Sequence, residues 1–216
     1  MNKPEVIRQI TERGVIPVIR AASADEARRA IDAIKAGGID IFEITMTVPG
    51  AVELIEKLAS FYGTDALIGA GTVLDAEAAR ACVDAGAQFI ISPALNLETI
   101  RFCNQAETVV MPGALTPTEI LTAWNAGADF VKVFPAGALG GASYLKALKA
   151  PLPHIKLIPT GGVSLETAAD FIQAGASAIG VGADLVDLQA LRNGQDNLIT
   201  EKVRQYLEIV RNARRI

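Results

Sequence analysis

Eight short apolar segments alternate with segments of helical periodicity along almost the whole chain, and this alternation restricts the fold more than any other feature. The apolar segments are residues 15–20, 41–46, 66–72, 89–93, 108–112, 130–135, 156–160 and 178–182. Runs this short and this apolar are typical of parallel strands that are buried on both faces and joined by helices. The pattern predicts an α/β fold, a single (β/α)8 TIM barrel.

A weak internal repeat agrees with this prediction. Four of the expected helices close on an Ala-Gly sequence just before the second, fourth, sixth and eighth apolar segments. The glycines are Gly38, Gly86, Gly127 and Gly175. Glycine readily adopts the left-handed conformation that ends a helix, so the repeat indicates a two-pair module used four times. An open doubly wound sheet is the alternative, but it usually has a glycine-rich turn after its first strand, where this chain reads RAAS.

An additional N-terminal helix is expected over residues 3–13, ended by Gly14. Ser23 has the position of a helix cap after the first strand, and Ser164 that of a cap after the seventh. With 216 residues, half of them hydrophobic, and no linker, the chain is expected to form one domain over residues 1–216.

Composition excludes several classes of function. The formal net charge is −4, whereas a nucleic-acid or anionic-membrane partner normally requires a basic face. We see no signal peptide and no apolar run as long as a membrane span, so we expect a cytoplasmic protein. Cys82 and Cys103 have no CxxC partner, and His154 is the sole histidine. We therefore expect no disulfide, no metal site and no Ser-His-Asp triad.

One lysine stands in an apolar segment, where Phe130, Lys132 and Phe134 share a strand face. Burial disfavours the ammonium form, and a neutral amine is a nucleophile for carbonyl compounds. A lysine that snorkels to water is the alternative. Glu43 shares the inward parity of the second strand, so Glu43 and Lys132 can both face the barrel interior. Either Lys132 forms an imine and Glu43 shuttles protons for it, or the two residues form a structural salt bridge.

Two glycine-rich loops follow the last two predicted strands. Gly161 and Gly162 lie in the first loop, and Gly182 and Ala183 lie in the second. Loops at this place in a barrel often hold a phosphate through their main-chain amides, and glycine lets the backbone approach the anion closely. The sequence predicts that these loops bind a phosphate or a carboxylate.

Six short motifs occur in order along the chain. They are Glu43-Ile44-Thr45, Gly69-Ala70-Gly71-Thr72, Ile91-Ser92-Pro93, Met111-Pro112-Gly113, Lys132-Val133-Phe134-Pro135 and Pro159-Thr160-Gly161-Gly162. With these motifs the chain resembles the class I 2-keto-3-deoxy-6-phosphogluconate (KDPG) aldolase family, which includes 4-hydroxy-2-oxoglutarate aldolases. The resemblance implies a homotrimer and chemistry without a cofactor or metal.

The resemblance also implies roles for single residues. Lys132 corresponds to the Schiff-base lysine and Glu43 to the general acid and base. The residues expected to line the pyruvate region are Thr72, Pro93, Phe134 and Thr160. Many family members carry an arginine where this chain has Thr47, so we expect Arg20, at the end of the first strand, to meet the substrate anion, with Thr47 as a further substrate-binding residue. The alternative is that Arg20 pairs with a helix acid. Ala183 stands where relatives often have a serine that helps to bind phosphate.

The expected function is the reversible cleavage of KDPG into pyruvate and glyceraldehyde 3-phosphate. Partners are small 2-keto acids and aldehydes, with no nucleic acid and no membrane. Two alternatives keep the chemistry and change the substrate to 4-hydroxy-2-oxoglutarate or to the phosphogalactonate epimer. A third alternative, from another class, is a barrel that serves as an assembly subunit.

Overall fold

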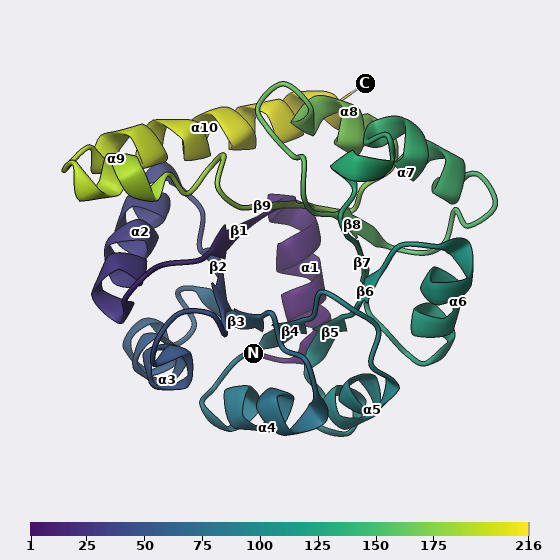
Figure 1. The fold of residues 1–216 in the computed structure, drawn as a ribbon, viewed down its shortest axis with the longest axis horizontal. Helices are drawn as coiled ribbons and strands as arrows, with labels where there is room; N and C mark the ends of the chain where they lie inside the picture. Colours follow the sequence, from purple (N-terminus) through teal and green to yellow (C-terminus); the bar gives the residue numbers. More distant parts are fainter. Residues whose placement is uncertain (216) are drawn as a thin grey trace.

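Parallel strands lie in the middle of the structure and helices lie around them (Figure 1). The structure is a computed structural model in which residues 1–215 are described. The strands are β1 Val15–Ile19, β2 Ile41–Thr45, β3 Leu67–Gly71, β4 Phe89–Ile91, β5 Val109–Met111, β6 Gly113–Ala114, β7 Val131–Val133, β8 Leu157–Pro159 and β9 Ile179–Val181. They form one sheet in the order β5-β4-β3-β2-β1-β9 and another in the order β6-β7-β8. All pairs are parallel, which confirms an α/β fold with parallel strands.

Helices connect the successive strands, apart from β5 and β6, as the alternation predicted. They are α1 Lys3–Arg13, α2 Ala24–Gly37, α3 Ala51–Tyr62, α4 Ala76–Asp84, α5 Leu97–Gln105, α6 Pro117–Asn125, α7 Ala142–Lys149, α8 Ala168–Gln173, α9 Leu188–Arg192 and α10 Asp196–Ala213, with a 3-10 turn η1 at Gly137–Leu139. Every residue of the strands is buried, as expected for strands covered on both faces. Within residues 1–215, no helix combines the length and the apolar character that crossing a membrane requires.

The fifth predicted strand is divided, so the described residues contain nine strands instead of eight. Pro112 separates β5 from β6, because proline has no N–H to donate to a sheet ladder. Its carbonyl oxygen still accepts a hydrogen bond from Lys132 N at 2.9 Å. At the other side of the β6-β7-β8 sheet, a single bridge between Thr160 and Gly180 links the end of β8 to β9.

The glycine repeat closes helices as predicted. Gly38, Gly86, Gly127 and Gly175 have φ angles of +105°, +97°, +96° and +96°. Ser23 caps α2 by accepting a hydrogen bond from Glu26 N at 3.1 Å. The prediction for Ser164 was wrong, since α8 begins only at Ala168. The Ser164 carbonyl accepts from Thr167 N and Ala168 N, so a turn precedes the helix and Thr167 takes the cap position.

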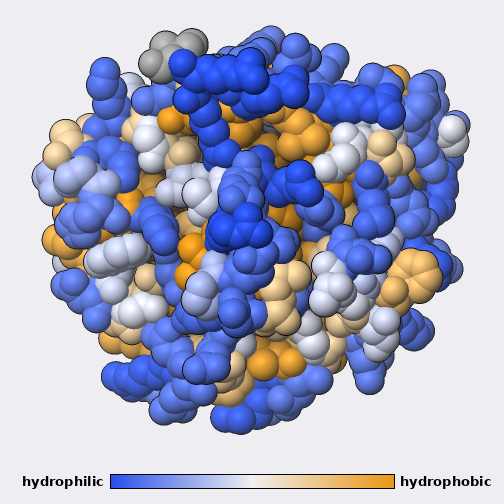
Figure 2. All heavy atoms as spheres, turned by 180° about the vertical axis from the view of Figure 1, so that it is seen from behind, coloured by the Kyte–Doolittle hydropathy of each residue, from blue (hydrophilic) through white to orange (hydrophobic). Residues whose placement is uncertain are grey.

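Helix α1 crosses the middle of the strand arrangement in Figure 1 and packs against β1 and β5. Lys3 Nζ pairs with Asp129 at 3.0 Å and donates to Asn104 Oδ1 at 2.9 Å, both near the N-terminal ends of strands. On the face opposite to that seen in Figure 1, a largely hydrophilic ridge runs down the middle of the surface (Figure 2). The predicted N-terminal helix is confirmed, and it leaves the C-terminal strand ends uncovered.

Candidate active site

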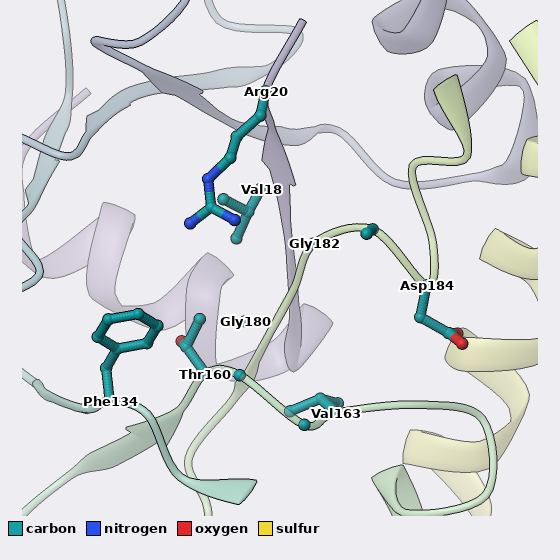
Figure 3. A pocket seen from close by; sticks show the side chains of 11 residues that line it. Val18, Arg20, Phe134, Thr160, Val163, Gly180, Gly182 and Asp184 are labelled. Atoms are coloured by element: carbon teal, nitrogen blue, oxygen red, sulfur yellow. The ribbon is translucent and has the colours of Figure 1, made fainter. Parts of the chain in front are cut away.

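A pocket of about 250 Å³ lies at the C-terminal ends of β1, β8 and β9 (Figure 3). Seven residues that the sequence singled out line it: Arg20, Phe134, Thr160, Gly161, Gly162, Gly182 and Ala183. The other lining residues are Val18, Val163, Gly180 and Asp184. The two glycine-rich loops, which are some twenty residues apart in sequence, therefore meet at one site, as predicted.

Arg20 reaches into this pocket from the end of β1 (Figure 3). Its Nη1 atom lies 3.7 Å from the position that a Cβ on Gly182 would occupy. Within residues 1–215 its guanidinium has no hydrogen bond and no ion pair, because the nearby helix acid Glu26 pairs with Arg192 at 2.6 Å. The alternative that Arg20 pairs with a helix acid is wrong, and its charge is available to a ligand.

Free main-chain donors face the same region. Among the described residues, the N–H groups of Gly162, Val163, Ala183 and Asp184 have no recorded protein acceptor. A cation with several unused amides is the arrangement that binds an anion without further side chains. The pocket can therefore hold a phosphate or a carboxylate.

The first glycine loop packs backbone to backbone on the loop that follows β7. A Cβ on Gly162 would lie 2.7 Å from Gly137 Cα, and Gly162 has a φ of +81°. Gly137 N also donates to Gly161 O at 2.8 Å. Glycine is required at residue 162 by both the conformation and the close approach.

Lys132 lies in the middle of β7 with only 3% of its surface exposed. Its Nζ atom is 5.1 Å from the ring centroid of Phe134, which lines the pocket. Burial lowers the pKa of Lys132, the Glu43 carboxylate opposes this shift, and the Arg20 cation adds to it. The buried position excludes a lysine that snorkels to water.

Glu43 lies in the middle of β2, 2% exposed, and within residues 1–215 its Oε1 atom has no hydrogen-bond partner. Burial raises the pKa of Glu43, and Lys132 and Arg20 oppose this rise. No salt bridge joins Glu43 to Lys132 in the described residues, so the structural salt bridge is not what the fold builds here. Burial thus shifts the pKa of each group toward its neutral form, and the charge of each group opposes the shift of the other.

Five predicted residues do not line the pocket: Lys132 and Glu43, which lie buried in β7 and β2, and three others, Thr47, Thr72 and Pro93. The Thr47 hydroxyl lies 2.7 Å from that of Thr45, which is 3.0 Å from the Ile19 carbonyl oxygen at the end of β1. Thr72 has a φ of +57° and directly follows Gly71, where a Cβ would lie 2.0 Å from Glu43 Oε1.

The third of these residues is Pro93. Its carbonyl oxygen lies 2.2 Å from the position of a Cβ on Gly113, the residue in register with Lys132. Thr72 and Pro93 thus border the strands that carry Glu43 and Lys132, not the anion loops.

Four residues line the pocket without having been predicted: Val18, Val163, Gly180 and Asp184. Asp184 directly follows Ala183 and is an acid within an anion loop, which is a signal that the sequence contained. Its Oδ2 atom accepts a hydrogen bond from the Tyr206 hydroxyl at 2.5 Å. No group of three or more His, Cys, Asp or Glu side chains able to hold a metal occurs within residues 1–215.

The two cysteines are remote from this chemistry. Cys82 and Cys103 are both buried in helices, and neither forms a disulfide in the described part of the chain. Burial raises the pKa of Cys82 to about 11 and that of Cys103 to about 12. Both thiols are therefore inert at neutral pH.

Known proteins show the same sequence pattern and fold. The chain is 40% identical over 176 residues to the 2-dehydro-3-deoxy-6-phosphogalactonate aldolase of Escherichia coli K12, which covers 81% of this chain and 85% of that protein. A KDPG aldolase from Legionella pneumophila, solved with pyruvate captured as a covalent carbinolamine intermediate, has a TM-score of 0.85 and 32% identity and covers 92% of this chain and 96% of that one.

A third similar structure is a cube-shaped protein cage designed by fusing symmetric oligomeric domains. It has a TM-score of 0.85 and 35% identity and covers 94% of this chain and 73% of the cage chain. The family model for KDPG and KHG aldolase matches residues 6–202. Together with the buried lysine and glutamate, this match over most of the length places the chain in the KDPG and KHG aldolase family.

Proposed function

We propose that this protein is a Schiff-base aldolase that reversibly cleaves KDPG into pyruvate and glyceraldehyde 3-phosphate. The observation that carries the proposal is the buried Lys132, whose pKa is lowered and whose amine adjoins the Phe134 ring at the pocket wall. A lysine with a lowered pKa supplies the neutral amine that attacks a ketone, and the buried Glu43 can give and take the protons of the reaction. The pocket with Arg20 then takes the distal phosphate.

We infer that the two sheets belong to one (β/α)8 barrel in a single domain. In this arrangement β5 and β6 are two halves of the fifth strand, and the bridge between Thr160 and Gly180 closes the ring between β8 and β9. A barrel places its active site at the C-terminal strand ends, where the pocket lies. The domain predicted over residues 1–216 includes residue 216, which lies outside the described residues.

The first half of the reaction forms the imine. The Lys132 amine attacks the C2 ketone, a new C–N bond forms, and the ketone oxygen takes a proton to give a carbinolamine. Glu43, as the carboxylic acid, donates the proton with which that hydroxyl leaves as water. The product is a protonated imine, and Glu43 is left as the carboxylate.

The second half breaks the carbon–carbon bond. The Glu43 carboxylate, directly or through a water molecule, takes the proton of the C4 hydroxyl, and the electrons of the C3–C4 bond move into the imine. Glyceraldehyde 3-phosphate leaves, the enamine is protonated at C3, and hydrolysis releases pyruvate and the lysine. Lys132, Glu43 and water account for each proton in this scheme, which needs no cofactor.

Binding roles follow from position. Arg20 and the free amides of residues 162–163 and 183–184 hold the phosphate, while Thr160 and Phe134 contact the pyruvate part between the phosphate and Lys132. Thr72 and Pro93 border the strands of Glu43 and Lys132 and complete the pyruvate region. Thr47 follows β2, and its hydroxyl contacts that of Thr45, which donates to the Ile19 carbonyl oxygen beside Arg20, so Thr47 supports the position of Arg20.

A second candidate substrate is the phosphogalactonate epimer of KDPG. The Escherichia coli relative at 40% identity is named for that substrate, and this supports testing it. A third candidate, 4-hydroxy-2-oxoglutarate, would place a carboxylate in the anion pocket, where Ala183 leaves only main-chain amides in the second loop. Comparing kcat/KM for the three compounds separates these substrates, and equal values would show that the pocket does not select among them.

We also propose that the protein is a homotrimer. The similarity to a cage domain described as a symmetric oligomer supports an oligomer of some kind. Light scattering of the purified protein tests the number of subunits. A trimer with full aldolase turnover agrees with an enzyme, whereas a large symmetric particle without turnover favours an assembly subunit.

Reduction with borohydride in the presence of pyruvate tests the proposed function. We expect the mass of a pyruvate adduct on Lys132, and no adduct and no KDPG cleavage in Lys132→Ala. Lys156→Ala is a matched control, because Lys156 Nζ also lies near a phenylalanine ring, 5.4 Å from the centroid of Phe130, but outside the pocket. A wild-type protein that yields no adduct on Lys132 would overturn the proposal.

A further inference from the structure

Two side chains of α10 hold the loop that follows β9. Lys202 Nζ donates to the carbonyl oxygen of Asp184 at 2.6 Å, and the Tyr206 hydroxyl donates to Asp184 Oδ2 at 2.5 Å. Lys202 and Tyr206 are four residues apart, so they project from the same face of the helix. One loop residue is thus bound both by its main chain and by its side chain.

Helix α10 is firmly packed where these two residues leave it. Tyr206 is fully buried, and Val203 fills the space beside Gly37, where a Cβ would lie 2.5 Å away. The Thr200 hydroxyl donates to the Ala33 carbonyl oxygen in α2 at 2.8 Å. Burial, together with Asp184, raises the pKa of Tyr206, so its hydroxyl stays protonated and remains a donor at neutral pH.

Asp184 carries a negative charge in a pocket that we assign to an anion. It lines the pocket together with Arg20 and the glycine loops. Figure 3 shows its carboxylate directed away from the Arg20 guanidinium. A carboxylate turned the other way would compete for Arg20 and repel a bound phosphate. The direction of this side chain therefore matters for binding.

We propose that Lys202 and Tyr206 are positioning residues for the anion site. They hold the Asp184 carboxylate away from Arg20 and fix the Ala183 and Asp184 amides toward the ligand. The inference rests on the proposed function, because it takes the distal phosphate of the substrate as the group bound there. Ala183 has no hydroxyl, so in this chain the position of the amides carries the contribution of the second loop.

Replacing Tyr206 with phenylalanine removes one anchor and keeps the ring. For Tyr206→Phe we expect the KM for KDPG to rise about tenfold, the effect of losing one good hydrogen bond to a charged group. The kcat, and the KM for the unphosphorylated 2-keto-3-deoxy sugar acid, should stay within about twofold, since neither depends on the phosphate. Lys202→Met should change the same KM in the same direction.

Tyr62→Phe is the matched control. The Tyr62 hydroxyl, on α3, also contacts an aspartate, Asp32 Oδ1 on α2, at 3.5 Å. Both residues lie away from the pocket. A tyrosine that only stabilises the fold would affect both substrates equally. Addition of Asp184→Asn to Tyr206→Phe should lower the KM for KDPG again, because the released side chain then has no charge to repel the phosphate.

Calorimetric titration with inorganic phosphate measures the same site without turnover. Weaker phosphate binding by Tyr206→Phe, and recovery in the double variant, is the expected result. Unchanged phosphate binding in both Tyr206→Phe and Lys202→Met would overturn the inference. Pyruvate trapping on Lys132 of the same proteins separates the two proposals: wild type without an adduct refutes the aldolase, whereas an adduct with unchanged phosphate binding refutes only the positioning. If Tyr206→Phe does not fold, Lys202→Met decides.

Discussion

Gly71 leaves the space that the Glu43 carboxylate fills, since a Cβ at residue 71 would lie 2.0 Å from Glu43 Oε1. The two residues lie on neighbouring strands, β2 and β3, and Gly71 is in register with Thr45. A real Cβ cannot stand at that distance, so any side chain at residue 71 must displace the carboxylate. The glycine of the Gly69-Ala70-Gly71-Thr72 motif is therefore a condition for the position of Glu43.

Gly71→Ala should lower kcat about a hundredfold, the effect of moving a catalytic group by about 1 Å. The extra methyl group should also cost about 1–3 kcal/mol of stability. Gly63→Ala is the control, because nothing lies within 4 Å of its added Cβ while its φ of +53° still imposes strain. Steady-state kinetics and urea unfolding of both variants check this. Equal loss of kcat in the two variants would contradict the assigned role of Gly71.

The pKa of Lys132 should move in opposite directions in two variants. Glu43→Gln removes the charge that raises this pKa, so the pKa should fall further; Arg20→Met removes a charge that lowers it, so the pKa should rise. Imine formation requires the neutral amine, and its rate increases with pH through the pKa of the lysine. The pH dependence of borohydride trapping with pyruvate measures the shift. Parallel shifts in the two variants would refute the assigned electrostatics.

Glu43→Gln should also change how stability depends on pH. Burial raises the folded-state pKa of Glu43 above its usual value of 4.5, so the folded protein binds this proton more tightly than the unfolded chain. In wild type, the proton on Glu43 contributes a stabilisation that is fully present below pH 4.5 and is lost as the pH rises through the raised folded-state pKa. Glu43→Gln should not lose stability in this way as the pH rises. Urea unfolding at several pH values measures it, with Glu53→Gln, an exposed carboxylate, as the control.

Thr45→Val should destabilise the protein by about 1 kcal/mol, because the buried Thr45 hydroxyl no longer donates a hydrogen bond to the Ile19 carbonyl oxygen. Thr47→Ala, at an exposed position, should change stability by less than about 0.5 kcal/mol. Thermal unfolding compares the two variants. A similar loss in both would show that the hydroxyl pair, and not the bond to β1, stabilises this strand end.

Much of the fold was predictable because burial on both strand faces leaves continuous apolar runs, and because left-handed glycines mark helix ends. Pro112 marks the division of the fifth strand in the sequence. Whether a proline interrupts a strand depends on which neighbouring strand would have accepted the missing N–H. The late start of α8 was not predictable, since Ser164 has the properties of a cap and only the turn formed with Thr167 displaces it. The closed barrel and the trimer remain proposals.

The site was predictable in its charged and glycine residues, because strand parity alone places Glu43, Lys132 and Arg20 inward. Thr72 and Pro93 were harder, since a residue after a strand end can face either the pocket or the neighbouring strand. The role of Gly71 as empty space and the anchoring of Asp184 by α10 depend on distances between distant segments. No local pattern in the sequence contains those distances.

The free guanidinium of Arg20 has a kinetic consequence. A chain with a net charge of −4 repels an anionic substrate over most of its surface, so Arg20, the basic residue among the described residues that line the pocket, focuses the local field and guides the approach. Such guidance is screened over about 10 Å at 0.1 M salt. Capture of a phosphorylated substrate from dilute solution should therefore slow with rising ionic strength, while the turnover of substrate already bound remains unaffected.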